Sequence, residues 1–91
     1  MEFEWDESKR LANIRKHGVD FIDMPLLFKS PMLESIDDRE DYGEERVTAL
    51  GTANGAVFRI VFTVRQSRIR IISAMKASKN DQETYYRSVY T

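Results

Sequence analysis

Arginine is the residue whose type and spacing in this sequence best support chemistry. Five arginines lie between positions 46 and 70, and two lysines follow them: Arg46, Arg59, Arg65, Arg68 and Arg70, then Lys76 and Lys79. A guanidinium group is planar, stays charged near neutral pH and presents a donor fork that matches a phosphate group. Several such groups on one surface would bind a nucleic-acid backbone and stabilise charge developing at phosphorus. The alternative is that they are ordinary solubilising residues on a solvated face.

Charge is divided unequally between the two halves of the chain. Residues 1–45 carry six basic and thirteen acidic residues, a net of −7, whereas residues 46–91 carry eight and two, a net of +6. The total of −1 therefore hides a basic half that a polyanion would respond to. A second interpretation is that the two halves neutralise each other in the folded protein, and both interpretations can be partly true.

Other reactive side chains are few. His17 is the only histidine, which excludes a mechanism using one histidine as base and another as acid. Glu44 is a candidate general base, or else the partner of Arg65 in a cross-strand ion pair. Tyr85, Tyr86 and Tyr90 are candidates for stacking on a base, with packing between helix and sheet as the alternative. There is no cysteine, and the acidic stretch 37–45 lacks the ligand order of a calcium loop, so we expect no metal and no cofactor.

The elements that must position these side chains begin with two helices. Residues 3–5 form a candidate edge strand, and Asp6 is placed to cap a helix over 8–17 that Gly18 ends. Asp20 is placed to cap a second helix reaching about Phe28, with Pro31 blocking its continuation. A strand over 32–36 and an acidic loop over 37–45 follow. Ser78 and Asp81 predict a capping box that opens a last helix, reaching about Tyr90.

Two short turns fix the pairing of the central strands. Asn54-Gly55 predicts a hairpin that sets Leu50 opposite Arg59, and a turn at Gln66-Ser67 sets Phe62 opposite Ile71 and Ile60 opposite Ser73. Both registers give the same two faces, which a slip of one residue would exchange. One face is apolar and bears Phe58, Ile60, Phe62, Val64, Ile69 and Ile71. The other, here called the arginine face, bears the five arginines together with Leu50, Val57, Val61 and Ile72.

These elements predict an α+β domain of order β-α-α-β-β-β-β-α, an antiparallel sheet with helices on its apolar face. A chain of 91 residues is expected to form one domain, residues 1–91. The first residues lack the basic and apolar segments of a signal peptide, and the apolar runs are too short to span a bilayer. We therefore expect a cytoplasmic protein without a membrane partner.

The sequence also resembles a known family, the BrnT toxins of type II toxin–antitoxin systems. The resemblance spans nearly the whole chain in an ordered series of short motifs. It rests on Phe3-Glu4-Trp5-Asp6, Lys9, Asn13, Lys16-His17-Gly18, Phe21, Phe28, Pro31, Glu44-Glu45-Arg46, Gly51, Thr63, Arg65, Arg70-Ile71-Ile72-Ser73-Ala74, Lys76-Ala77, and the tyrosine at Tyr85 or Tyr86.

The resemblance implies a RelE-like fold and a metal-independent endoribonuclease that cleaves RNA and blocks translation. It implies a BrnA-like antitoxin partner, a heterotetrameric complex, and contact with operator DNA only through the antitoxin. Arg65, Arg70 and Lys76 match the basic positions to which the family's catalysis is attributed. Arg46, Arg59, Arg68, Lys79 and Tyr85 are then the candidate substrate-binding residues.

The chain departs from the family pattern at two places where arginine is usual. Met75 follows Ile-Ser-Ala directly, and Asp81-Gln82 stands where the family tends to have Glu then Arg. Three interpretations therefore stay open: a ribonuclease, a catalytically attenuated module that only docks an antitoxin or another acidic partner, and an RNA-binding domain that does not cleave.

Overall fold

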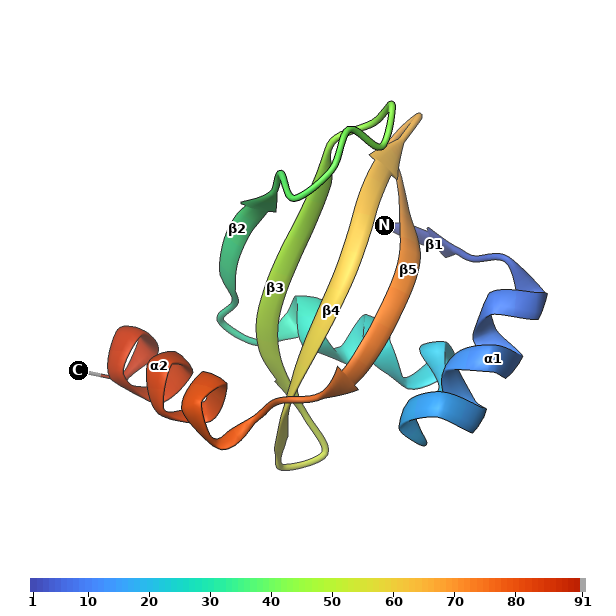
Figure 1. Ribbon diagram of the computed structural model, residues 1–91. Helices are drawn as coiled ribbons and strands as arrows, with labels where there is room; N and C mark the ends of the chain where they lie inside the picture. The colour runs from blue at the N-terminus through green and yellow to red at the C-terminus, as the bar shows by residue number, and fades with distance from the viewer. Residues whose placement is uncertain (91) are drawn as a thin grey trace.

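Three helices and five strands follow one another in the computed structural model, which describes residues 1–90 (Figure 1). The helices are α1 (Glu7–His17), η1 (Phe21–Lys29) and α2 (Lys79–Val89), and the strands are β1 (Glu2–Glu4), β2 (Leu33–Asp37), β3 (Arg46–Ala53), β4 (Ala56–Arg65) and β5 (Arg68–Lys76). The predicted α+β class and element order are confirmed. The second helix, η1, is a 3-10 helix rather than an α-helix.

The strands form one sheet in the order β1-β5-β4-β3-β2. Four of the strands pair antiparallel as predicted, but β1 runs parallel to β5, with Glu2 beside Arg68 and Glu4 beside Arg70. The sheet is therefore mixed rather than wholly antiparallel. No tight turn joins β1 to its neighbour, so its direction is free of the constraint that makes hairpin strands antiparallel.

The predicted caps set the ends of the helices. The Asp6 side chain accepts a hydrogen bond from the Lys9 amide, and Gly18 ends α1 in a left-handed conformation with φ of 68°. The Asp20 side chain accepts from the Ile22 amide at the start of η1. The Ser78 side chain accepts from the Asp81 amide at the start of α2. Each cap satisfies an amide that the helix itself leaves unpaired.

The hairpin between β3 and β4 has the predicted register. Leu50 pairs with Arg59 and Thr52 with Val57, and Asn54 and Gly55 take the positive φ angles, 51° and 81°, that a tight two-residue turn needs. The Asn54-Gly55 turn was therefore sufficient to predict the register of this hairpin.

The hairpin between β4 and β5 contains a β-bulge that was not predicted. Phe62 pairs with Ile71 as expected, but Val61 pairs with Ser73 and Ile60 with Ala74, so the predicted pairing of Ile60 with Ser73 is wrong. The bulge contains one extra residue of β5. Every side chain of β5 after it therefore lies on the opposite face from the one that the predicted register gives.

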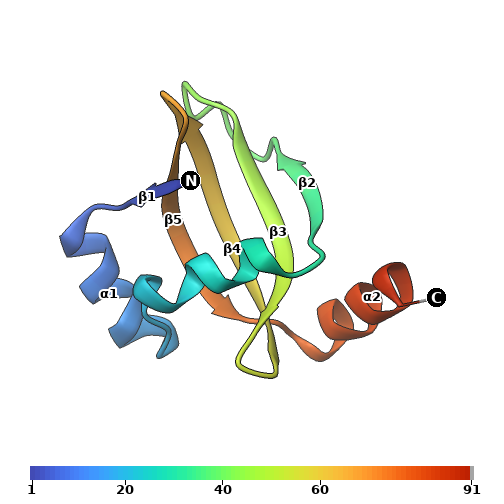
Figure 2. The same cartoon turned by 180° about the vertical axis from the view of Figure 1, so that it is seen from behind.

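The main core lies where η1 crosses the apolar face of the sheet, while α1 lies to the side, next to β5 (Figure 2). Phe62 is 4% exposed, and its ring meets Phe28 edge-on at 5.1 Å, while Phe28 stacks on Phe3 at 5.1 Å. Ile60, Ile69 and Ile71 are buried as predicted, and Phe58 packs against the cluster. Val64 also belongs to this face by sequence alternation, but it is 58% exposed near the end of β4.

Helix α2 corrects the expectation that all helices cover the apolar face. Its Tyr85 is fully buried in a second cluster with Leu50, Val57 and Ala77, and two of these residues belong to the arginine face. The Tyr85 hydroxyl donates a hydrogen bond to the Pro31 carbonyl at 2.7 Å. One end of the arginine face is therefore covered, and of its predicted aliphatic residues Val61 remains half-buried there. Ile72, predicted to lie opposite Val61, is the residue at the bulge and has no partner in the ladder, because Ser73 pairs with Val61 instead.

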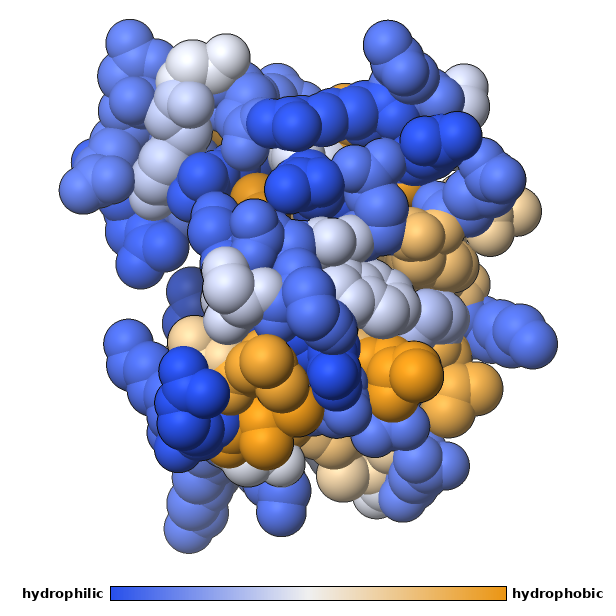
Figure 3. Space-filling view, turned by 90° about the vertical axis from the view of Figure 1, so that its right-hand side faces the viewer, coloured by the Kyte–Doolittle hydropathy of each residue, from blue (hydrophilic) through white to orange (hydrophobic). Residues whose placement is uncertain are grey.

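The surface on the side of β1 and α1 is mainly hydrophilic, and its largest hydrophobic patches lie in its lower half (Figure 3). Within residues 1–90, no helix is long and apolar enough to cross a membrane.

Candidate nucleic-acid interface

Strand β1 brings acidic side chains onto the edge of the arginine face. Arg68 Nε lies 3.1 Å from a Glu2 carboxylate oxygen, and Arg70 Nη1 lies 2.7 Å from a Glu4 carboxylate oxygen. Parallel pairing of β1 with β5 produces both contacts, because paired residues project to the same side of a sheet. The two halves of the chain therefore do neutralise each other here.

A third acidic residue, Glu44, contacts Arg65 and Arg46 on the same face. Glu44 accepts a hydrogen bond from Arg65 Nη2 at 2.8 Å and lies 3.4 Å from Arg46 Nε. The bond from Arg65 lowers the pKa of the Glu44 carboxyl below its ordinary value, so Glu44 is a weaker base than a free carboxylate. The guanidinium of Arg46 also lies over the Tyr42 ring, 3.9 Å from its centre. The ion-pair alternative for Glu44 is confirmed.

Arg59, near the middle of the face, is paired least tightly. Its nearest carboxylate is Asp81 on α2, with 3.9 Å between Nη1 and Oδ2. Within residues 1–90 it donates no hydrogen bond, and its side chain is 40% exposed. Of the five arginines of this face, Arg59 is the one whose donor fork is most available to an added anion.

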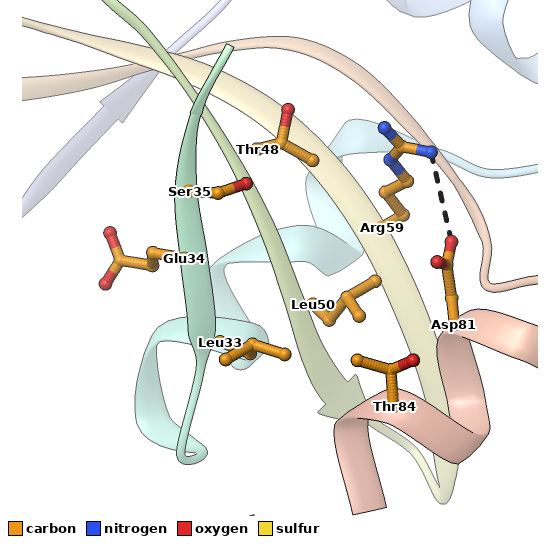
Figure 4. A pocket seen from close by; sticks show the side chains of 8 residues that line it. All are labelled: Leu33, Glu34, Ser35, Thr48, Leu50, Arg59, Asp81 and Thr84. Atoms are coloured by element: carbon orange, nitrogen blue, oxygen red, sulfur yellow. Dashed lines mark ion pairs between the residues drawn. The ribbon is translucent and has the colours of Figure 1, made fainter. Parts of the chain in front are cut away.

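A pocket of about 370 Å³ lies on one side of Arg59, between β2 and α2 (Figure 4). Its lining combines the apolar Leu33 and Leu50 with the ion pair of Arg59 and Asp81, whereas the Glu34 carboxylate at its border points away from it. The volume falls within the range of small-molecule sites, roughly 300–1,000 Å³. The Asp81 carboxylate on its wall, 3.9 Å from Arg59, makes it unfavourable for a phosphate group.

A smaller cavity of about 120 Å³ lies on the arginine face beside Arg59. It is lined by Arg59, Val61, Ser73 and Met75, and by Arg39 from the loop between β2 and β3. The bulge is the reason that Ser73 and Met75 line this cavity, since Met75 pairs directly with Arg59. Arg39 was missed from the sequence because it lies in an acidic loop, and only a contact across the fold brings it here.

The eight residues singled out from the sequence do not all come together. Arg46, Arg59, Arg65, Arg68 and Arg70 share the arginine face, and Lys79 begins α2 with an exposed side chain. Lys76 pairs with Phe58, which sets it on the opposite, helix-covered face beside Asp20 and Asp23. Tyr85 is fully buried, so its ring has no surface on which a base could stack, whereas Tyr86 and Tyr90 are exposed.

Asn13 of α1 holds β5 at the residue between Ser73 and Met75. Its side-chain amide donates to the Ala74 carbonyl at 2.7 Å and to the Val19 carbonyl at 2.9 Å, and its oxygen accepts from the Ala74 amide at 3.1 Å. An unpaired buried backbone group costs about 1–3 kcal/mol, so this one side chain both satisfies and positions the strand. A polar residue in the middle of a helix was the only sequence signal for this role.

Within the described residues, no three histidine, aspartate or glutamate side chains gather in a way that could hold a metal ion.

Comparison with known protein families shows which family the chain belongs to. Residues 5–81 match the family described as the ribonuclease toxin, BrnT, of type II toxin–antitoxin systems. The chain belongs to the BrnT family. The match covers α1, η1, β2 to β5 and the start of α2, so every arginine of the arginine face lies inside it. Glu2 and Glu4, which pair with Arg68 and Arg70, lie before it. No curated protein matches the chain.

Membership of the BrnT family makes this chain a ribonuclease toxin of a type II system, and such a toxin implies an antitoxin as its partner. The resemblance seen in the sequence is thereby confirmed. An arginine at position 75, which the family resemblance led us to expect, would face Arg59 across the ladder; this chain has Met75 instead.

Proposed function

We propose that this BrnT-family toxin is a metal-independent endoribonuclease that cleaves RNA bound across the arginine face and so inhibits translation. The observation that carries the proposal is the state of Arg59. It lies on a face shared by four other arginines, its closest carboxylate is 3.9 Å away, and a cavity with a second arginine opens beside it. Guanidinium groups arranged in this way suit a phosphodiester better than any neutral ligand.

The chemistry we propose is transfer of the phosphoryl group to the neighbouring 2′-hydroxyl. A bond forms between the 2′-oxygen and phosphorus, the bond from phosphorus to the 5′-oxygen breaks, and the hydroxyl proton ends on the departing 5′-oxygen. The products are a 2′,3′-cyclic phosphate and a 5′-hydroxyl end. Arginine donors stabilise the extra charge on the phosphoryl oxygens, and one such donor is worth roughly a factor of 100–1,000 in rate.

The individual residues contribute differently in this proposal. Arg59 contacts the phosphate at the cleaved bond, and Arg65 and Arg70 contact phosphates near it. Arg46, Arg68 and Lys79 hold the backbone on either side. Binding requires the arginines at the β1 edge to share their donors between Glu2 or Glu4 and a phosphate. Lys76 lies on the opposite face, so its part in catalysis needs RNA that passes around the end of β5.

The partner in the proposal is a BrnA-like antitoxin that covers the arginine face, excludes RNA and assembles with the toxin as a heterotetramer. Operator DNA is then contacted only through the antitoxin. Val61 supports this assignment, because a half-buried aliphatic residue between arginines is typical of a protein interface. A partner with acidic and apolar residues would complement both components.

A second function, a module that binds RNA or antitoxin without cleavage, is favoured by two observations. Four of the five arginines are hydrogen-bonded to carboxylates of the same chain, and Met75 occupies the position opposite Arg59.

One experiment separates the two functions. The antitoxin-free toxin is incubated with a 5′-labelled RNA in EDTA, alongside the same oligonucleotide with 2′-O-methyl groups. Cleavage of the RNA alone, with 2′,3′-cyclic phosphate ends, supports the ribonuclease. Binding of both oligonucleotides with no cleavage of either supports the attenuated module and contradicts the ribonuclease.

A further inference from the structure

We propose that Arg39, Arg59 and Ser73 form a binding site for one phosphate group of the RNA backbone, in which Arg39 is a phosphate-binding residue that the loop between β2 and β3 contributes. The inference rests on the proposed function, because it specifies how RNA is held on the same face. It adds a residue and a site that neither the sequence patterns nor the family match assigns.

The cavity has the size and lining that a single anionic group requires. Its volume of about 120 Å³ is well below the roughly 300 Å³ at which pockets for whole small molecules begin, so a phosphate fits and a nucleoside does not. The residues that line it include two guanidinium groups and one hydroxyl, with no carboxylate among them. The neighbouring pocket of Figure 4 differs in this respect, because the Asp81 carboxylate faces it.

Arg39 is held in place by a carboxylate on the last residue of β2. Its Nε and Nη2 atoms donate to the two oxygens of Asp37 at 2.8 and 2.9 Å. The Asp37 side chain is only 3% exposed and also accepts a bond from the Tyr42 hydroxyl at 3.4 Å. Hydrogen bonding from Arg39 lowers the pKa of Asp37 to about 2, so the anchoring carboxylate is ionised at neutral pH.

This anchoring leaves part of the guanidinium for a ligand. Within the described residues, the third nitrogen of Arg39, Nη1, has no hydrogen-bond partner, and the Arg39 side chain is 68% exposed. An arginine already fixed on one edge loses less conformational entropy when its other edge binds a phosphate. Arg59, which donates no hydrogen bond within residues 1–90, faces the same cavity from β4.

The test measures binding apart from cleavage. The probe is an uncleavable 2′-O-methyl RNA oligonucleotide, whose affinity is measured over a range of salt concentrations for the wild type, Arg39→Ala and the control Arg15→Ala. Arg15 is an exposed arginine on α1, so the control removes the same charge away from the site. For Arg39→Ala we expect about five- to tenfold weaker binding and a salt slope reduced by about 0.7, the value for one lost phosphate contact on a single strand.

A second measurement uses inorganic phosphate and amide NMR. We expect the Ser73 and Met75 amides of the wild type and Arg15→Ala to shift on titration, and those of a folded Arg39→Ala not to shift. Equal behaviour of Arg39→Ala and Arg15→Ala in both measurements overturns the inference, even if the wild type cleaves RNA as proposed. Loss of binding in Arg39→Ala alone supports the site, even if no RNA is cleaved and the proposed ribonuclease is wrong. Failure of the wild type to bind either probe overturns both proposals.

Discussion

Met75 of β5 lies directly opposite Arg59 of β4, and both side chains line one cavity on the arginine face. Cross-strand partners share a face and lie about 4.5–5.5 Å apart at Cβ, so a cation at position 75 would be added next to Arg59. The departure from the family pattern at position 75 therefore lies next to Arg59 on the arginine face.

The substitution Met75→Arg is therefore expected to increase RNA cleavage, by at least about tenfold if the new guanidinium reaches the phosphoryl oxygens. Initial rates on one labelled RNA in EDTA measure the effect, with Met75→Leu as the control that keeps the apolar character. A variant that folds normally, still binds antitoxin and cleaves no faster would show that Met75 does not limit activity.

Phe62 tests the register of the central hairpin. Because this ring is almost fully buried against Phe28, Phe62→Ala should reduce the free energy of unfolding by roughly 3–5 kcal/mol. Val64→Ala, on the same strand but at an exposed position, should cost less than about 0.5 kcal/mol. Urea denaturation gives both values. A loss below about 1 kcal/mol for Phe62→Ala would mean that this strand does not pack as described.

The lowered pKa of Asp37 predicts that the folded protein loses stability as the pH becomes acidic. Its pKa is lowered from 3.8 to about 2 by hydrogen bonding from Arg39, so below pH 4 the unfolded chain binds a proton that the folded protein does not. The stabilisation is complete above about pH 4 and is lost as the pH falls toward 2. Thermal unfolding from pH 5 to 2 should show a shallower decline for Asp37→Asn than for the wild type. Parallel declines would argue against the anchor of Arg39.

The features that the sequence predicted correctly depend mainly on residues close together in the chain. The Asn54-Gly55 turn fixes the pairing of β3 with β4, and the caps at Asp6 and Ser78 depend only on residues within one helical turn. Alternation along β4 then gave the two faces of the sheet correctly, including the grouping of the five arginines on one of them.

What could not be read depends on contacts between distant residues. The bulge in β5 lies beside Ala74, which Asn13 holds from 61 positions away, and no neighbouring residue signals it. It moves Met75 onto the arginine face and Lys76 off it. The position of α2 on that face likewise depends on Tyr85 reaching the Pro31 carbonyl.

Two substitutions separate the electrostatic from the apolar contribution to antitoxin binding. Arg68→Glu should slow association and reduce its dependence on salt, because exposed charges mainly steer encounter. Val61→Asp should raise the dissociation rate, because it introduces a charge where aliphatic contact is expected. Surface plasmon resonance against the cognate antitoxin measures both rates.

Hydrogen exchange provides the control for this prediction. Antitoxin bound as proposed should protect amides of β4 and β5. Protection limited to residues 6–30 would place the antitoxin on α1 and η1 instead and would overturn the assignment of the arginine face as its binding surface.

The central claim is that RNA is cleaved on the arginine face around Arg59, and the cleavage rate of Arg59→Ala tests it most directly. The antitoxin-free wild type, Arg59→Ala and Arg15→Ala are compared on one labelled RNA in EDTA, after circular dichroism has shown that all three are folded. We predict that Arg59→Ala loses roughly 100-fold or more in rate, and that Arg15→Ala, which has the same net charge, stays within about threefold of the wild type. Equal rates for the wild type and Arg59→Ala would contradict the account.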